Sequence, residues 1–156
     1  MGSVRLRDVI EDDLPVFFEH QRDPVANRMA AFPARDREAF MTHWTANVLG
    51  NDEGNARTIL SNDAVVGNIV SWAQDGEVLV GYWIGREQWG RGIGTRALAL
   101  FLTEVEPRRP LNAHVARRNV GSIRVLERSG FVVVSEETLV EHGVEIEDVT
   151  MRLDAG

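Results

Sequence analysis

A glycine-rich segment at residues 89–95 holds the residue types with the clearest chemical use in this sequence. It reads Trp89-Gly90-Arg91-Gly92-Ile93-Gly94-Thr95. Apolar residues recur at the helical period from Ala97 to Val105, so a helix is predicted to begin near the glycines. The first N–H groups of a helix have no partners within it and lie at the positive end of its dipole, so they bind phosphate oxygens wherever side chains leave the approach open. The segment therefore predicts a pyrophosphate-binding turn.

The glycines also allow other interpretations. Glycines also occur in turns where only the backbone conformation requires them, and that interpretation stays open. A dinucleotide-binding turn has a third glycine where this chain has Thr95, and an acidic residue about 20 positions later, where this chain has Arg117 and Arg118. A nucleoside triphosphate loop ends in Gly-Lys-Ser/Thr, a triplet that this sequence lacks. Both of these phosphate loops fit poorly.

The residues before the glycine-rich segment predict a strand. Residues 78–84 are rich in β-branched and aromatic side chains and are few enough for a strand. Gly81 within them indicates a bulge or a close approach of another group to the backbone. We therefore expect a strand that is splayed near Gly81 and leads into the glycines.

A second segment, residues 119–131, predicts a short helix with a defined start and end. Asn119 suits the N-cap, and Gly130 suits the left-handed position beyond the last turn. Phe131 then falls where its ring packs on Leu126. These roles explain the segment by structure alone and leave only Ser122 without an assigned use.

Together the two segments resemble the GNAT superfamily of acetyl-CoA-dependent N-acetyltransferases. The cofactor loop of that family is written Gln/Arg-x-x-Gly-x-Gly/Ala, and residues 89–94 match every fixed position except the first, which is Trp89. Tryptophan at that position is similar to the ribosomal-protein N-terminal (alanine) acetyltransferases. Residues 119–131 are similar to the same subgroup in the pattern Asn119-x-x-Ser122-x-x-Val125-Leu126-Glu127-x-x-Gly130-Phe131. The resemblance is clear over residues 69–134, and the first third of the chain matches in outline only.

The resemblance implies a fold and a cofactor site. The fold is a mixed α/β domain with a mainly antiparallel sheet and flanking helices, in which two parallel strands diverge and leave a slot for the pantetheine chain of acetyl-CoA. A backbone N–H near residues 83–85 is expected to stabilise the acetyl oxygen. The residues expected at the cofactor are Trp83, Ile84, Trp89, Gly90, Arg91, Gly92, Ile93, Gly94, Thr95, Asn119 and Ser122. Arg124 and Arg128 are either contacts of the nucleotide 3′-phosphate or, as the preferred interpretation, solvated surface residues.

The family also implies direct attack of an amine on the thioester, with the coenzyme thiolate leaving. Many members carry a tyrosine that protonates this thiolate, but Leu126 stands at the matching position. The only tyrosine, Tyr82, lies on the predicted strand, so Ser122, one helical turn before Leu126, is the candidate acid. Glu141 is the candidate base among the glutamates of the last hairpin. His114 is a weaker candidate, because a lone histidine is more often structural.

The acceptor is expected to be a primary amine. An α-amine with a pKa near 7.7 to 8.0 is roughly 10 to 20% neutral at pH 7, whereas a lysine amine is roughly 0.04% neutral, so an α-amine needs a much weaker base. The subgroup resemblance favours a protein N-terminus. A small-molecule amine and a noncatalytic acyl-CoA-binding domain remain as alternatives.

Composition predicts one globular domain over residues 1–156. The 156 residues are 44% hydrophobic and 26% charged, with a net charge of −7 and no cysteine. These features exclude disulfides and a cysteine nucleophile, and they disfavour broad nucleic-acid binding. The sequence has no signal segment and no apolar run long enough for a membrane span, so we expect a cytoplasmic protein without a metal or membrane partner. Homodimers are common among the proteins it resembles.

The remaining pattern predicts the elements that position these residues. Helices are expected at residues 12–20 and 37–48, and strands at residues 4–9, 56–60, 64–72, 111–116, 131–140 and 144–153.

Overall fold

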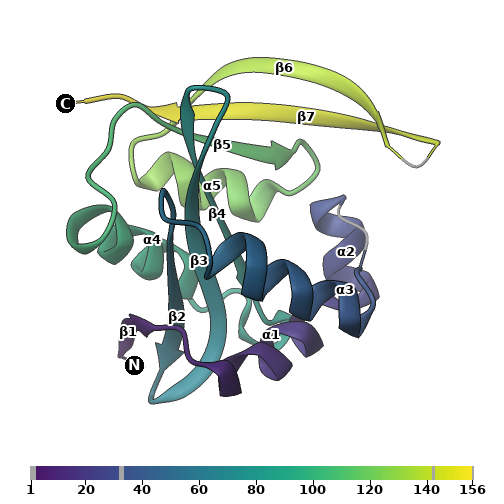
Figure 1. Cartoon of the computed structure of the whole chain (residues 1–156). Helices are drawn as coiled ribbons and strands as arrows, with labels where there is room; N and C mark the ends of the chain where they lie inside the picture. The colour runs from purple at the N-terminus through teal and green to yellow at the C-terminus, as the bar shows by residue number, and fades with distance from the viewer. Residues whose placement is uncertain (1–2, 32–33, 142, 156) are drawn as a thin grey trace.

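Seven strands form one sheet with helices against both faces in the computed structural model of the chain (Figure 1). The structure describes residues 3–31, 34–141 and 143–155. The strands, in their order across the sheet, are β1 (Val4–Asp8), β2 (Asn55–Ser61), β3 (Ala64–Gln74), β4 (Glu77–Ile84), β5 (Leu111–Ala116), β7 (Val144–Leu153) and β6 (Val132–Glu141). The helices are α1 (Leu14–Gln21), α2 (Pro24–Ala30), α3 (Arg37–Thr42), α4 (Ile93–Glu104) and α5 (Val120–Arg128). Among the described strands, only β4 and β5 pair in parallel, which confirms the predicted mixed, mainly antiparallel fold.

Two hydrophobic cores lie on opposite sides of the sheet. Ile69 and Val70, consecutive residues of β3, pack into different cores, because consecutive side chains of a strand point to opposite faces. The larger core includes α4 and α5, where Leu126 is fully buried. The other holds α1 and the helical segment after α3, where the rings of Phe17 and Trp44 have centroids 4.9 Å apart. No helix in the described ranges is long and apolar enough to cross a membrane.

Two helical regions differ from the sequence prediction. The pattern missed α2, which is too short to show a hydrophobic period. Its start is marked by Asp23, whose carboxylate accepts the N–H of Val25 at 2.9 Å, and by Pro24 at the first position. The helix predicted over residues 37–48 changes its winding, because α3 ends at Thr42 and His43–Val48 continues as a π-helix.

Gly81 makes room for an aromatic ring. β4 keeps a regular register with β3, in which Gly81 stands opposite Val70. A Cβ atom on Gly81 would lie 3.4 Å from the ring of Trp72, which comes from β3. The predicted close approach is therefore right, and the alternative of a bulge at Gly81 is wrong.

β4 and β5 diverge almost as soon as they pair. Their parallel pairing consists of Val78 with Leu111 and Leu79 with Asn112. Beyond Leu79, β4 stays paired with β3 but leaves β5, so within the described residues its other edge has no ladder partner. This divergence opens the predicted slot between the two strands.

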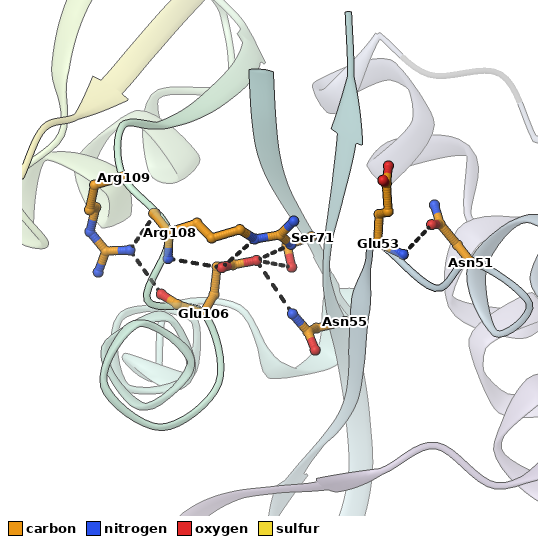
Figure 2. Close-up of polar contacts among 7 residues, drawn as sticks. All are labelled: Asn51, Glu53, Asn55, Ser71, Glu106, Arg108 and Arg109. Atoms are coloured by element: carbon orange, nitrogen blue, oxygen red, sulfur yellow. Dashed lines mark hydrogen bonds and ion pairs between the residues drawn. The ribbon is translucent and has the colours of Figure 1, made fainter. Parts of the chain in front are cut away.

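A buried carboxylate fixes the end of α4 to the sheet. Glu106 is fully buried just beyond α4, and Figure 2 shows it between Arg108 and Ser71 of β3. Its carboxylate accepts hydrogen bonds from Arg108 Nε at 3.0 Å and Nη2 at 2.7 Å, and from Ser71 Oγ at 2.7 Å. Burial alone would raise the pKa of Glu106, but the hydrogen bonds from Arg108 and Ser71 lower it to about 2. The network holds α4, whose other end carries the glycines, against the sheet.

We expect Glu106→Gln to remove an acid-sensitive part of the folding free energy. The pKa of Glu106 falls on folding from 4.5 to about 2, so its stabilisation is complete above pH 4.5 and is lost as the pH falls toward 2. Between pH 7 and pH 3 this loss amounts to about 2 kcal/mol in the wild type. Urea unfolding at both pH values measures it, with Glu104→Gln at an exposed position of α4 as the control. Unchanged acid dependence in Glu106→Gln would contradict the expectation.

Candidate functional site

One cavity brings together the two segments singled out from the sequence. Its volume is about 550 Å³, within the range of about 300 to 1,000 Å³ that is typical of small-molecule sites. It lies between β4, α2 and the starts of α4 and α5. Of the residues expected at the cofactor, it is lined by Trp83, Ile84, Trp89, Gly90, Gly92, Ile93, Gly94, Thr95, Asn119 and Ser122.

The glycine-rich segment turns the chain from β4 into α4. Gly90 and Gly92 have φ angles of +77° and +75°, a left-handed conformation that favours glycine. Gly92 directly precedes α4, and a Cβ atom on Gly90 would meet nothing within 4 Å. The backbone therefore requires both glycines, and at the same time no side chain at Gly90 covers the start of α4. The structural interpretation of this turn is therefore confirmed, and the phosphate-binding interpretation stays a prediction.

The free edge of β4 offers backbone groups to the cavity. The N–H of Gly85 donates to Val66 on β3 at 2.9 Å. Because bonded and non-bonded positions alternate along an antiparallel pair, the N–H groups of Gly85 and Trp83 face β3, and that of Ile84 faces away from it. The carbonyl of Ile84 accepts the Trp89 Nε1–H at 3.0 Å. Within residues 83–85, Ile84 is thus the one whose N–H points into the slot.

The end of α1 supports this part of β4. The indole Nε1–H of Trp83 donates to the carbonyl of His20 at 3.1 Å. The imidazole of His20 lies so close to Gly85 that a Cβ atom there would be 2.8 Å from it. Burial lowers the pKa of His20, and its Nδ1 has no hydrogen-bond partner among the described residues. We interpret His20 as a neutral packing group that fixes the end of the strand.

Helix α5 has the start and the end that the sequence predicted. The side-chain oxygen of Asn119 accepts the N–H of Ser122 at 3.3 Å. At the other end Gly130 has a φ of +99°, and the N–H of Phe131 donates to Leu126 at 3.1 Å. This is a Schellman motif, and the two apolar residues share one core.

Ser122 lies within hydrogen-bond distance of Tyr82, which was not among the site residues predicted from the sequence. The hydroxyl oxygens of Tyr82 and Ser122 are 2.6 Å apart, and both residues line the cavity. The Tyr82 hydroxyl also lies 3.3 Å from the carbonyl oxygen of Ser122. Burial raises the pKa of Tyr82 to about 12, although the bond with Ser122 acts in the opposite direction. Sequence alone missed this pair because 40 positions separate the residues.

Arginines supply the charge around the cavity. Arg118, Arg124 and Arg128 line it, and none of the described lining residues is acidic. The preferred interpretation of Arg124 and Arg128 as mere surface residues is incomplete, because both are exposed and also border the cavity. Arg91 is exposed, lies 3.5 Å from Gln88 Oε1 and is not among the lining residues.

Three apolar residues of the lining come from the helix that the pattern missed. Ala26, Met29 and Ala30 of α2 contribute to the lining. The Asp23-Pro24 pair was the signal that could have located this helix.

The structure describes the side chain of only one of the two candidate bases. Glu141 ends β6 in the hairpin that extends beyond β5 (Figure 1), and its side chain lies outside what the structure describes. His114 is exposed on β5, with Nδ1 3.1 Å from Thr150 Oγ1 and 3.4 Å from Asp148, and it is not among the lining residues. In the described ranges no three or more His, Asp or Glu side chains gather as a metal site would require.

The arrangement matches the parts of a coenzyme A molecule. Its phosphates are anionic, and the cavity has a helix N-terminus without covering side chains and three arginines. Its pantetheine chain is extended and carries amides, and the cavity has a strand edge that, among the described residues, has no ladder partner beyond Leu79. The residues present therefore fit this group.

Comparisons with known proteins identify the family of the chain. A family model described as an acetyltransferase (GNAT) domain matches residues 3–132. A search of curated proteins gave no match.

Solved structures share the fold. A phosphinothricin acetyltransferase of Sinorhizobium meliloti in complex with acetyl-CoA is 22% identical, with a TM-score of 0.82 over 98% of this chain and 89% of that one. A spermidine N-acetyltransferase of Vibrio cholerae in complex with CoA and spermine is 14% identical, with a TM-score of 0.80 over 97% and 95%. A Salmonella typhimurium protein with its cofactor acetyl-CoA is 17% identical, with a TM-score of 0.73 over 97% and 93%. The chain, with its glycine turn, divergent strands and matched domain, belongs to the GNAT family of acetyl-CoA-dependent N-acetyltransferases.

Proposed function

We propose that this chain acetylates the α-amine at the N-terminus of a protein, with acetyl-CoA as the acetyl donor. The finer assignment of the acceptor rests on the resemblance of residues 89 and 119–131 to ribosomal-protein N-terminal (alanine) acetyltransferases. The chemistry of the cavity supports the proposed function.

The observation that carries the proposal is the convergence of three kinds of anion- and amide-binding group on one cavity. The pyrophosphate binds at the start of α4, over Gly90 and Gly92. Arg118, Arg124 and Arg128 hold the remaining phosphate charge. The pantetheine chain lies along the free edge of β4, with the thioester toward α2. Thr95 and Asn119 contribute further polar contacts.

The part of the lining that comes from α2 favours an acceptor whose amine is next to an uncharged group. Met29, Ala26 and Ala30 are apolar, and the described lining offers no carboxylate. A polyamine with several positive charges would call for carboxylates in its site. A peptide N-terminus has only one charge, and a small residue behind it fits the apolar wall.

Three residues have a role in the proposed reaction. The amine nitrogen attacks the thioester carbon, the carbon–sulfur bond breaks, and its electron pair leaves on sulfur while the amine gives up a proton. The Ile84 N–H stabilises charge on the acetyl oxygen, and the Ser122 hydroxyl donates to the departing sulfur. Glu141 takes the amine proton through water from the hairpin beyond β5. A base of this strength suffices because an α-amine is already partly neutral at pH 7.

A small-molecule amine is the second candidate acceptor. The similar structures include a spermidine and a phosphinothricin acetyltransferase. A noncatalytic acyl-CoA-binding role would be consistent with Leu126 at the position where many relatives have a tyrosine. Turnover with an amine panel separates these possibilities.

We expect acetyl-CoA and CoA, but not ATP or NAD, to raise the Tm of the protein. A ligand at about 100 times its Kd adds about 2.7 kcal/mol, which corresponds to a shift of about 5 to 10 °C for a chain of this size. Differential scanning fluorimetry with each compound at about 1 mM measures the shift.

Gly92→Glu should abolish that shift, because it places a carboxylate where phosphate binds. Gly76→Glu is the matched control, since Gly76 also has a positive φ, of +80°, but lies in the β3–β4 turn. A full shift in Gly92→Glu, or none in the wild type, would contradict the cofactor assignment.

The acceptor class predicts a pH profile. With a peptide α-amine, kcat/KM should rise about tenfold per pH unit at low pH and level off near pH 8, where the amine becomes neutral. With spermidine or a lysine side chain, the rise should continue toward pH 10. Thioester consumption between pH 6 and 10 measures the profiles, and a higher kcat/KM for spermidine than for peptides would favour the second candidate.

Ser122→Ala should lower kcat by about 10- to 100-fold with little change in KM for acetyl-CoA, because a hydrogen bond to a charged group contributes about 1.5 to 3 kcal/mol. Ser129→Ala, at the other end of α5, is the control and should behave like the wild type. Unchanged kcat in Ser122→Ala would remove Ser122 from the mechanism.

A further inference from the structure

Tyr82 and Ser122 join two elements across the slot. Tyr82 comes from the part of β4 that has left β5, and Ser122 from the first turn of α5. Their hydroxyl oxygens are 2.6 Å apart. A Cβ atom on Gly94 would lie 4.0 Å from the Tyr82 ring and 3.5 Å from Val125, so the ring is held between α4 and α5. The pair therefore has a fixed position within the cavity.

We propose that Tyr82 is a positioning residue that directs the Ser122 hydroxyl onto the sulfur of coenzyme A. The inference rests on the proposed function, because it requires coenzyme A in the slot. It gives a chemical use to the tyrosine on the strand in a chain that has Leu126 where many relatives have their tyrosine.

The direction of the hydrogen bond follows from acidity. A phenol, with a pKa near 10, is a stronger donor than an aliphatic hydroxyl. Ser122 offers the Tyr82 hydroxyl two acceptors, Oγ at 2.6 Å and the carbonyl oxygen at 3.3 Å, and the shorter contact is the one to Oγ. We therefore assign Tyr82 as the donor to Ser122 Oγ, which leaves the proton of Ser122 for another acceptor. The N–H of Ser122 is already engaged by Asn119, so the hydroxyl is the group that Ser122 can offer to a ligand.

The leaving step needs a hydrogen bond and not a proton from Tyr82. Burial raises the pKa of Tyr82 to about 12, whereas an alkyl thiol has a pKa of about 8.5. Tyr82 thus stays protonated while the electron pair of the carbon–sulfur bond moves to sulfur. Ser122 donates to that thiolate, and Tyr82 strengthens the bond by polarising Ser122.

An isolated serine would do this less well. A serine hydroxyl in the first turn of a helix rotates and also bonds to backbone groups. By occupying a lone pair of Ser122 Oγ, Tyr82 removes that freedom. Substitution of Tyr82 should therefore weaken coenzyme A binding only when Ser122 is present. A double-variant cycle tests this dependence.

Calorimetric binding of CoA and of desulfo-CoA, which lacks the sulfur, tests the proposal without any acceptor. At pH 9.5 about 90% of a thiol with a pKa near 8.5 is ionised. Tyr82→Phe should weaken CoA binding about fivefold and leave desulfo-CoA binding unchanged. Ser122→Ala should weaken CoA binding about tenfold, and the double variant no further, since a hydrogen bond to a charged group contributes at least about tenfold. Arg118, Arg124 and Arg128 also favour the thiolate, but they are the same in every variant.

Each outcome has a distinct meaning. Equal weakening of CoA and desulfo-CoA binding by Tyr82→Phe would mean that the Tyr82 ring only packs. Unchanged CoA binding in Tyr82→Phe would mean that the hydroxyl pair does not interact with the sulfur. Either result overturns the proposal. Failure of the wild type to bind both compounds would instead overturn the proposed function. If Tyr82→Phe does not fold, Ser122→Ala and Ser122→Thr decide, because only Ser122→Thr should keep the preference for CoA over desulfo-CoA. Ser129→Ala serves as the control.

Discussion

The divergence of β4 from β5 is the constraint on which the site depends. Parallel pairing stops after Leu79 and Asn112, while β4 continues in register with β3. A strand edge that is left unpaired inside a protein needs hydrogen-bond partners. In the function proposed above an extended ligand with amide groups supplies them, because the N–H of Ile84 faces away from β3. The same opening gives Tyr82 room to reach Ser122.

The charge of the cavity is opposite to that of the whole chain. The sequence carries a net charge of −7, yet the charged residues among the described lining are Arg118, Arg124 and Arg128. Electrostatic attraction of an anionic cofactor is therefore local, and the acidic remainder of the surface repels anions elsewhere. Ala26, Met29 and Ala30 of α2 add apolar side chains to the same lining, so one cavity offers both groups that can bind phosphate and groups that suit an uncharged partner.

Helix α4 is held at both ends by different means. At its start, Gly90 and Gly92 adopt left-handed conformations that turn the chain from β4 into α4. At its end, Glu106 is buried and hydrogen-bonded to Arg108 and Ser71 (Figure 2). Because a buried carboxylate without partners would be strongly destabilising, this network fixes the helix against β3. The start of α4 can then remain open to a ligand while the far end anchors it.

Local sequence determined much of this protein. The glycine turn, the caps of α5 at Asn119 and Gly130, and most strands follow from rules that act within a few residues. These rules failed at α2, whose seven residues show no period although Asp23 and Pro24 mark its start.

Only the tertiary structure decided which groups meet. Tyr82 and Ser122 are 40 positions apart, and no local rule brings their hydroxyls within 2.6 Å. Likewise, the ladder with β3 decided that Ile84, and not Trp83 or Gly85, turns its N–H to the slot. The sequence by itself therefore determined the family and the glycine turn, because both depend on short segments. The chemistry at the thioester depends on strand register and on the gap between two strands, which are properties of the whole sheet.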